Sequence, residues 1–168
     1  MAEEIAQGLA VADTGPVNYL ILIGQIGLLP LLFQRIAIPA AVRDELLAPN
    51  APPEVRIWIA DPPPWLVIAE SHSPAPAAGL HKGEAAAIAL ALSLDNPLLL
   101  MDDRKGVGAA RSQGLRVTGT LGLLDMAAQA GLADFAAATR SLRRTVFRIP
   151  EALLDSMLAK YVTGGGNL

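Results

Sequence analysis

The 168-residue chain has no cysteine, and only 4% of its residues are aromatic and 17% charged. The absence of cysteine excludes a disulfide framework, a thiolate metal site and a cysteine nucleophile, so any metal would be held by oxygen. With few aromatics, the core has to be built from aliphatic residues and alanine, which favours helix over strand. Because 52% of the residues are hydrophobic, we expect one core in a single domain over residues 1–163, followed by a flexible tail, 164–168.

No charged residue occurs between positions 14 and 34, a run that raises the question of a membrane anchor. Glycine, proline and polar residues divide this run into pieces shorter than the ~20 residues that a bilayer span requires. The chain also begins without the basic segment of a secretory signal. We therefore expect buried core, no membrane contact and, with the absence of cysteine, a cytoplasmic location.

The net charge of −3 argues against a strongly basic, nonspecific nucleic-acid binder. Eight of the 13 lysines and arginines nevertheless fall between Arg104 and Arg148. These residues suit either contacts with phosphates or a solvated helix face, and their pattern alone leaves both interpretations open.

Short apolar segments alternate with helical patterns, which indicates a parallel sheet covered by helices on both faces. Strands are predicted at residues 9–13, 35–38, 65–69, 98–101 and 115–117. Helices are predicted at 17–23, 28–33, from 39 through 45, 54–60, 83–94, 103–113, 121–130, 135–143 and 150–161. Eight of the 13 prolines lie between positions 49 and 76, so this stretch is expected to be an elaborated loop region, mobile over 71–80.

Acidic residues stand where these elements begin or end. Asp13 ends the first strand, and Asp102 and Asp103 follow the fourth, at the sheet edge where α/β proteins bind ligands. Glu84 opens a helix whose next ten residues carry no charge. Each acid alone is also explained as a turn or helix-capping residue. Together they favour one pocket, in which the carboxylates would repel one another unless a cation such as Mg²⁺ or Mn²⁺ binds.

Helix geometry separates Glu45 from its neighbour Asp44. At 100° per residue, Glu45 borders the buried face of its helix and Asp44 points outward. No such argument separates Asp102 from Asp103; we favour Asp103 as the ligand and keep Asp102 as a supporting or alternative one. The candidate metal ligands are therefore Asp13, Glu45, Glu84, Asp102 and Asp103.

Other motifs carry less information. His72 and His81 are the two histidines of the chain, and neither has a metal-ligand spacing, so we do not expect them to act in catalysis. Gly106 and Gly108 lie within a predicted helix without forming a nucleotide-binding fingerprint, which indicates close helix packing.

Four acidic segments occur in order along the chain: DTGP at 13–16, IPAAVRDEL at 38–46, GEAAAIALA at 83–91 and LMDD at 100–103. In text and order they resemble the PIN domain, and more narrowly the DUF3368 group of PIN-like proteins. GTLGLL at 119–124 and FRIP at 147–150 extend the similarity over nearly the whole chain.

The resemblance implies a three-layer α/β/α sandwich with a central parallel sheet of about four to five strands. It implies a ribonuclease that hydrolyses RNA phosphodiesters with water activated by Mg²⁺ or Mn²⁺. The catalytic acids would be Asp13, Glu45, Glu84 and Asp103, with Asp102 beside them.

Many PIN proteins are VapC-type toxins that are dimeric and are silenced by an antitoxin over the acidic pocket. The resemblance thus extends to a toxin role, a homodimer and an antitoxin partner. Two residues depart from the pattern: Glu84 stands where most PIN domains carry Asp, and Val107 stands where this group often has Arg. The glutamate at position 84 concerns the geometry of metal binding. The valine at position 107 concerns the role of that arginine in substrate contact or helix anchoring.

Two alternatives to the nuclease are kept. One is a catalytically weak PIN-like module that binds RNA or protein without turnover. The other is a phosphoryl-transfer domain of receiver type, which also clusters acids at strand ends. The late position of the acid pair and the absence of a suitably placed strand-end lysine disfavour the receiver type.

Overall fold

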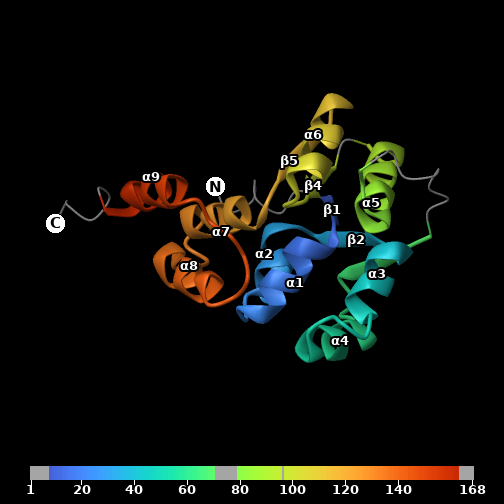
Figure 1. Cartoon of the computed structure of the whole chain (residues 1–168), viewed down its shortest axis with the longest axis horizontal. Helices are drawn as coiled ribbons and strands as arrows, with labels where there is room; N and C mark the ends of the chain where they lie inside the picture. The colour runs from blue at the N-terminus through green and yellow to red at the C-terminus, as the bar shows by residue number, and fades with distance from the viewer. Residues whose placement is uncertain (1–7, 71–78, 96, 163–168) are drawn as a thin grey trace.

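A parallel sheet of five strands forms the centre of the computed structural model, which describes residues 8–70, 79–95 and 97–162. The strand order is β3-β2-β1-β4-β5, and helices cover both faces (Figure 1). The strands are β1 (Leu9–Ala12), β2 (Arg35–Pro39), β3 (Leu66–Ala69), β4 (Leu98–Leu100) and β5 (Arg116–Thr118). The predicted α/β class, three layers and parallel sheet are confirmed.

Nine α-helices connect and follow these strands within the described residues. They are α1 (Thr14–Leu22), α2 (Leu29–Leu32), α3 (Ala40–Leu47), α4 (Pro53–Ala60), α5 (Lys82–Ser93), α6 (Arg104–Ser112), α7 (Thr120–Gln129), α8 (Phe135–Arg143) and α9 (Glu151–Val162); the 3₁₀ turn η2 (Ile26–Leu28) precedes α2. The helix predicted from residue 17 begins three residues earlier, at Thr14. Pro16 is tolerated in its first turn, because the backbone N–H that proline lacks would have no intrahelical acceptor there. Residues 71–78 of the predicted mobile segment and the predicted tail lie outside the described residues.

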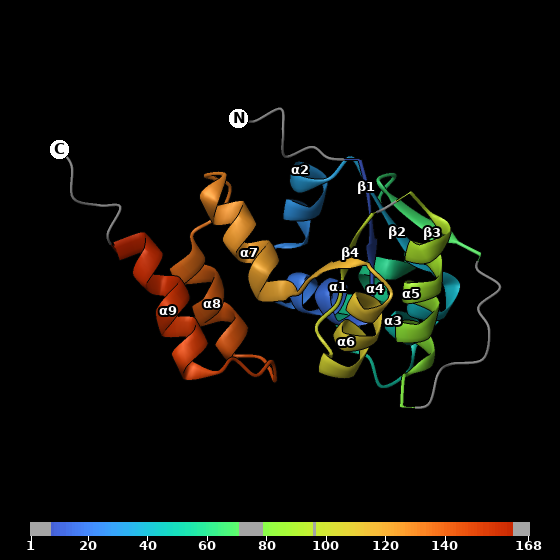
Figure 2. The ribbon, with the colours of Figure 1, turned by 90° about the horizontal axis from the view of Figure 1, so that it is seen from above.

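Alternate residues along each strand divide the core into two parts. Residues such as Ala10, Ile36 and Leu100 pack with α1, α2, α4, α7 and α8. Their neighbours, such as Val11 and Leu99, face α5 and α6 on the other side of the sheet. Figure 2 shows α7, α8 and α9 to one side of the sheet, with α9 outermost.

The uncharged run 14–34 forms α1, η2 and α2, and Leu20, Leu29 and Leu32 from it are fully buried in the core. No single helix of the described residues is both long and apolar enough to cross a membrane. The segments Thr14–Leu22 and Ile26–Leu32 meet that test only as a pair, bent by 118°.

The strand order reverses between β1 and β4. From β1 the chain adds β2 and β3 on one side, and it then returns to add β4 and β5 on the other. Such a switch point is where open α/β sheets bind ligands, outside the carboxyl ends of the strands. The order also differs from the 2-1-3-4-5 order of receiver domains, which removes the phosphoryl-transfer alternative.

The two glycines of α6 differ in their surroundings. A Cβ on Gly106 would lie 2.6 Å from the sulfur of buried Met101, whereas a Cβ on Gly108 would meet nothing within 4 Å. The close packing predicted for this helix therefore holds at Gly106 and not at Gly108.

These two positions form a matched pair for a stability measurement. We expect Gly108→Ala to raise the free energy of unfolding by about 0.5–1 kcal/mol, because alanine restricts the unfolded chain and favours helix. We expect Gly106→Ala to lower it by about 1–3 kcal/mol, because Met101 must move within a packed core. Urea denaturation of both variants checks this, and equal effects would contradict the close contact between position 106 and Met101.

Candidate active site

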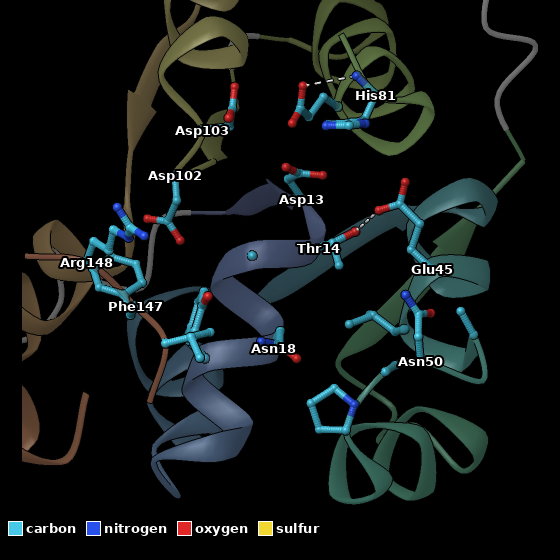
Figure 3. Close-up of a pocket in the computed structure, with 18 residues that line it drawn as sticks. Asp13, Thr14, Asn18, Glu45, Asn50, His81, Asp102, Asp103, Phe147 and Arg148 are labelled. Atoms are coloured by element: carbon cyan, nitrogen blue, oxygen red, sulfur yellow. Dashed lines mark hydrogen bonds between the residues drawn. The ribbon is translucent and has the colours of Figure 1, made fainter. Parts of the chain in front are cut away.

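A pocket of about 670 Å³ opens at the switch point between β1 and β4. Figure 3 shows Asp13 near its centre, with Asp102 on one side and Thr14 and Glu45 on the other. The structure brings all five predicted site residues to this pocket: Asp13, Glu45, Glu84, Asp102 and Asp103. Their roles as metal ligands and catalytic groups remain predictions.

Asp13 follows β1 directly and is the N-cap residue of α1, but its side chain makes no capping hydrogen bond. The residue is only 6% exposed, and its Oδ1 has no hydrogen-bond partner among the described residues. The pKa of Asp13 is raised to about 7: burial is the largest cause, a hydrogen bond from the Thr14 backbone acts against it, and the charges of nearby carboxylates add to it, namely those of Glu45, Glu84 and Asp102. The pKa of Asp13 thus depends on the charges of three other pocket carboxylates.

Glu45 reaches the pocket from α3, where two hydrogen bonds fix its carboxylate. The Gly83 N–H donates to Oε1 at 3.0 Å, and the Thr14 hydroxyl donates to Oε2. A Cβ on Gly83 would lie 2.6 Å from both oxygens, so only glycine leaves room for this contact. Asp44, in contrast, is exposed and pairs with Arg43 at 3.0 Å outside the pocket.

Glu84 is the third residue of α5 and is 6% exposed. Its Oε2 accepts a hydrogen bond from the His81 N–H at 3.2 Å, as the N3 residue of a capping box does. Burial raises the pKa of Glu84; the His81 backbone bond lowers it, and the charge of Asp103 raises it.

Asp102 and Asp103 each support the start of a helix. Asp102 accepts two bonds of 2.7 Å from Thr120, one from its N–H and one from its hydroxyl, at the start of α7. Burial raises the pKa of Asp102 and these bonds lower it. Asp103 caps α6, since its Oδ1 accepts the N–H groups of Lys105 at 2.9 Å and Gly106 at 3.1 Å. Both acids line the pocket, so both stay candidate ligands.

The pocket carboxylates form no ion pair with a lysine or arginine in the part of the chain that the structure describes, although Arg148 also lines the pocket. The ion pairs found there join other residues: Arg43 with Asp44, Arg143 with Glu151, and Lys160 with Asp125. Crowded carboxylates without a cation raise one another's pKa values, and this repulsion favours either bound protons or a bound divalent cation. The neighbouring carboxylates contribute in this way to the raised pKa of Asp13, after burial, which is the larger cause.

The donor set fits a hard divalent cation. All five side chains offer oxygen, and the unpartnered Oδ1 of Asp13 supplies a buried acceptor. Among the described residues, no three histidine or acidic side chains form a ready-made cage for one ion. Mg²⁺ does not require such a cage, because it keeps several waters and binds through one or two carboxylates.

Several pocket residues were not predicted from the sequence. His81 lines the pocket three residues before Glu84, and that capping-box spacing was an available signal. Asn18 lies one helical turn after Thr14, so it shares a face of α1. Arg148 comes from the segment between α8 and α9, and nothing local in the sequence indicates its position. His72 lies outside the described residues.

Comparison with known proteins gives one family and one solved structure. A family model described as DUF3368: PIN domain matches residues 9–162. The solved structure of a PilT N-terminus domain protein, SSO1118, from the hyperthermophilic archaeon Sulfolobus solfataricus P2 is similar, with a TM-score of 0.48 and 17% sequence identity; the match covers 68% of this chain and 89% of that one. No curated protein matches the chain.

The raised pKa of Asp13 predicts how the stability of the metal-free protein depends on pH. Because the folded state holds the Asp13 proton up to about pH 7 and the unfolded state releases it near pH 4, folding takes up a proton in this window. The stabilisation from this proton is fully present below the pKa that Asp13 has in the unfolded state. It is lost as pH rises through the pKa that Asp13 has in the folded state. We therefore expect the free energy of unfolding to fall between about pH 4 and pH 7, on the order of a few kcal/mol.

Urea denaturation in a chelator over this pH range checks the expectation. Asp13→Asn should flatten the profile, whereas Asp44→Asn, at an exposed carboxylate, should keep the wild-type slope. Parallel profiles for Asp13→Asn and wild type would show that Asp13 titrates normally.

Proposed function

The chain belongs to the PIN domain family of nuclease-like modules, and we propose on that premise that it is a divalent-metal-dependent endoribonuclease. The observation that carries the proposal is the acidic pocket: five carboxylates line one cavity, and none of them forms an ion pair with a described lysine or arginine. This arrangement is costly for a protein unless a cation binds there.

Each pocket residue has a distinct part in the proposal. Asp13, with its unpartnered Oδ1, is the central ligand. Glu45 is held toward the cavity by Thr14 and Gly83, and Glu84 lies in the first turn of α5. Asp103 completes the set, with Asp102 as its alternative or support. A bound Mg²⁺ or Mn²⁺ supplies Lewis acidity to the RNA phosphate and lowers the pKa of the attacking water.

The proposal extends to a toxin of the VapC type. It includes a homodimer and an antitoxin that covers the acidic pocket. It also includes a cytoplasmic location, in agreement with the absence of cysteine. The toxin, homodimer and antitoxin parts of the proposal rest on the resemblance of the chain to VapC-type PIN proteins.

Neighbouring residues on α3 allow a matched test of activity. We expect Glu45→Gln to reduce Mn²⁺-dependent RNA cleavage by more than the roughly 10–100-fold that loss of a supporting group costs a metal site. Asp44→Asn should cleave RNA like wild type, because Asp44 is exposed and pairs with Arg43 outside the pocket. Asp13→Asn should be as inactive as Glu45→Gln.

Cleavage rates of labelled single-stranded RNA, with and without chelator, provide the measurement. Equal rates in Glu45→Gln and Asp44→Asn would rule out the acidic pocket as the catalytic site. RNA binding without turnover at any Mn²⁺ concentration would favour the alternative of a binding module.

Metal binding can be measured without cleavage. We expect Mn²⁺ to stabilise the wild-type protein, by about 2.7 kcal/mol at a metal concentration 100 times the dissociation constant. The same titration should stabilise Asp13→Asn far less and Asp44→Asn fully. Thermal unfolding against Mn²⁺ concentration checks this, and an equal gain in both variants would place any bound metal elsewhere.

A further inference from the structure

A second cavity, of about 940 Å³, lies beside the acidic pocket. Its walls come from α6, the end of β5, the start of α7 and the segment that leads into α9. Three of its lining residues are arginines, Arg104, Arg111 and Arg148, and we call it the arginine groove. Asp102, Phe147 and Arg148 line both cavities, so the groove continues directly from the acidic pocket.

The three arginines stand on opposite walls of the groove. Arg104 and Arg111 are seven residues apart on α6, which puts them on one face, ~10 Å apart along the helix axis. Arg148 faces the groove from the segment between α8 and α9, and Figure 3 shows it close to Asp102. All three are exposed, and none forms an ion pair with a described residue.

The wall between the two cavities is held in place by aromatic packing. The Phe147 ring packs edge-on against Tyr19 of α1, with the ring centroids 4.8 Å apart and the planes at 81°. This contact ties the segment that carries Arg148 to the helix that follows Asp13. The backbone at Arg148 is therefore held beside the acidic pocket by the packing of the adjacent Phe147 side chain.

Electrostatics indicates what the groove binds. The chain has a net charge of −3. Its acidic pocket repels the phosphates of a polyanion, apart from a phosphate that a bound cation holds. A nucleic-acid strand therefore needs positive charge immediately outside the pocket. Guanidinium groups suit phosphate, because their planar donors match its oxygens.

We infer that the arginine groove binds the backbone of single-stranded RNA next to the bond that is cut, with Arg104, Arg111 and Arg148 in contact with its phosphates. The inference rests on the proposed function and adds to it the path of the substrate. The strand enters between α6 and the segment ahead of α9, passes the Phe147 wall and reaches the acids. Basic residues outside this path, such as Arg140 on α8, take no part.

The test measures RNA affinity in chelator, where no cleavage occurs. Fluorescence anisotropy of a labelled single-stranded RNA is recorded over a range of salt for wild type, for the three groove arginines replaced by Ala singly and together, and for Arg140→Ala. Arg140 is exposed and lines neither cavity, so it is the matched control. Melting curves confirm that the variants fold.

We expect the triple variant to bind RNA at least about 10-fold more weakly. Its plot of log affinity against log salt should be flatter by about 0.7 for each arginine removed. Arg140→Ala should keep the wild-type affinity and slope. If the triple variant matches Arg140→Ala in both, the inference is overturned.

A second readout separates this inference from the proposed function. With Mn²⁺, the groove variants should raise KM for a long RNA and leave kcat little changed, because the arginines bind substrate and transition state alike. If wild type does not cleave RNA but the groove variants still lose RNA affinity, the groove stands and the nuclease proposal fails. If wild type cleaves and the groove variants match Arg140→Ala, the nuclease proposal stands and the groove inference fails.

Discussion

The pairing of β1 with β4 is the constraint on which the site depends. The two strands run parallel from Ala10 opposite Leu98 to Ala12 opposite Leu100, and the Asp13 N–H extends the pairing by donating to the Leu100 carbonyl at 2.9 Å. The residues that follow the strands must therefore share one space at the sheet edge. Carboxylates at these positions are brought together by the backbone hydrogen bonds of the strand pair. The pKa of Asp13 is raised mainly by burial at this edge of the sheet and further by the nearby carboxylates.

Glycines and backbone donors then keep the crowded carboxylates in place. A Cβ on Gly119 would lie 2.6 Å from Oδ1 of Asp102, and one on Gly15 would lie 3.2 Å from its Oδ2. Gly83 makes the same room for Glu45. Because these positions have no side chain, the carboxylates pack against backbone and accept its N–H groups, as Asp102 does from Thr120. Among the described residues, the acids are thus oriented without an ion pair to lysine or arginine, which leaves their negative charge available to a cation.

Local features of the fold and site could be predicted from the sequence, and tertiary ones could not. Apolar periodicity located the strands and most helices within a few residues, and helix geometry distinguished Glu45 from Asp44, because both depend on neighbours in the chain. The position of Arg148 depends on how the segment ahead of α9 packs on α1 through Phe147, a contact between residues far apart in sequence. Asp102 and Asp103 could not be separated because both face the pocket while each also supports a different helix.

The capping bonds of the pocket acids bear on how sequences of related chains are interpreted. Glu84 receives the His81 N–H, Asp102 fastens the start of α7 and Asp103 fastens the start of α6. A descendant that no longer needed the pocket would still lose folding stability if it replaced any of them, so selection for folding alone would tend to retain these acids. Burial works against folding when Glu84, Asp102 or Asp13 is charged, but Asp13 makes no side-chain cap that offsets this cost. Position 13 should therefore be the first to drift to a neutral residue once selection on the pocket ends.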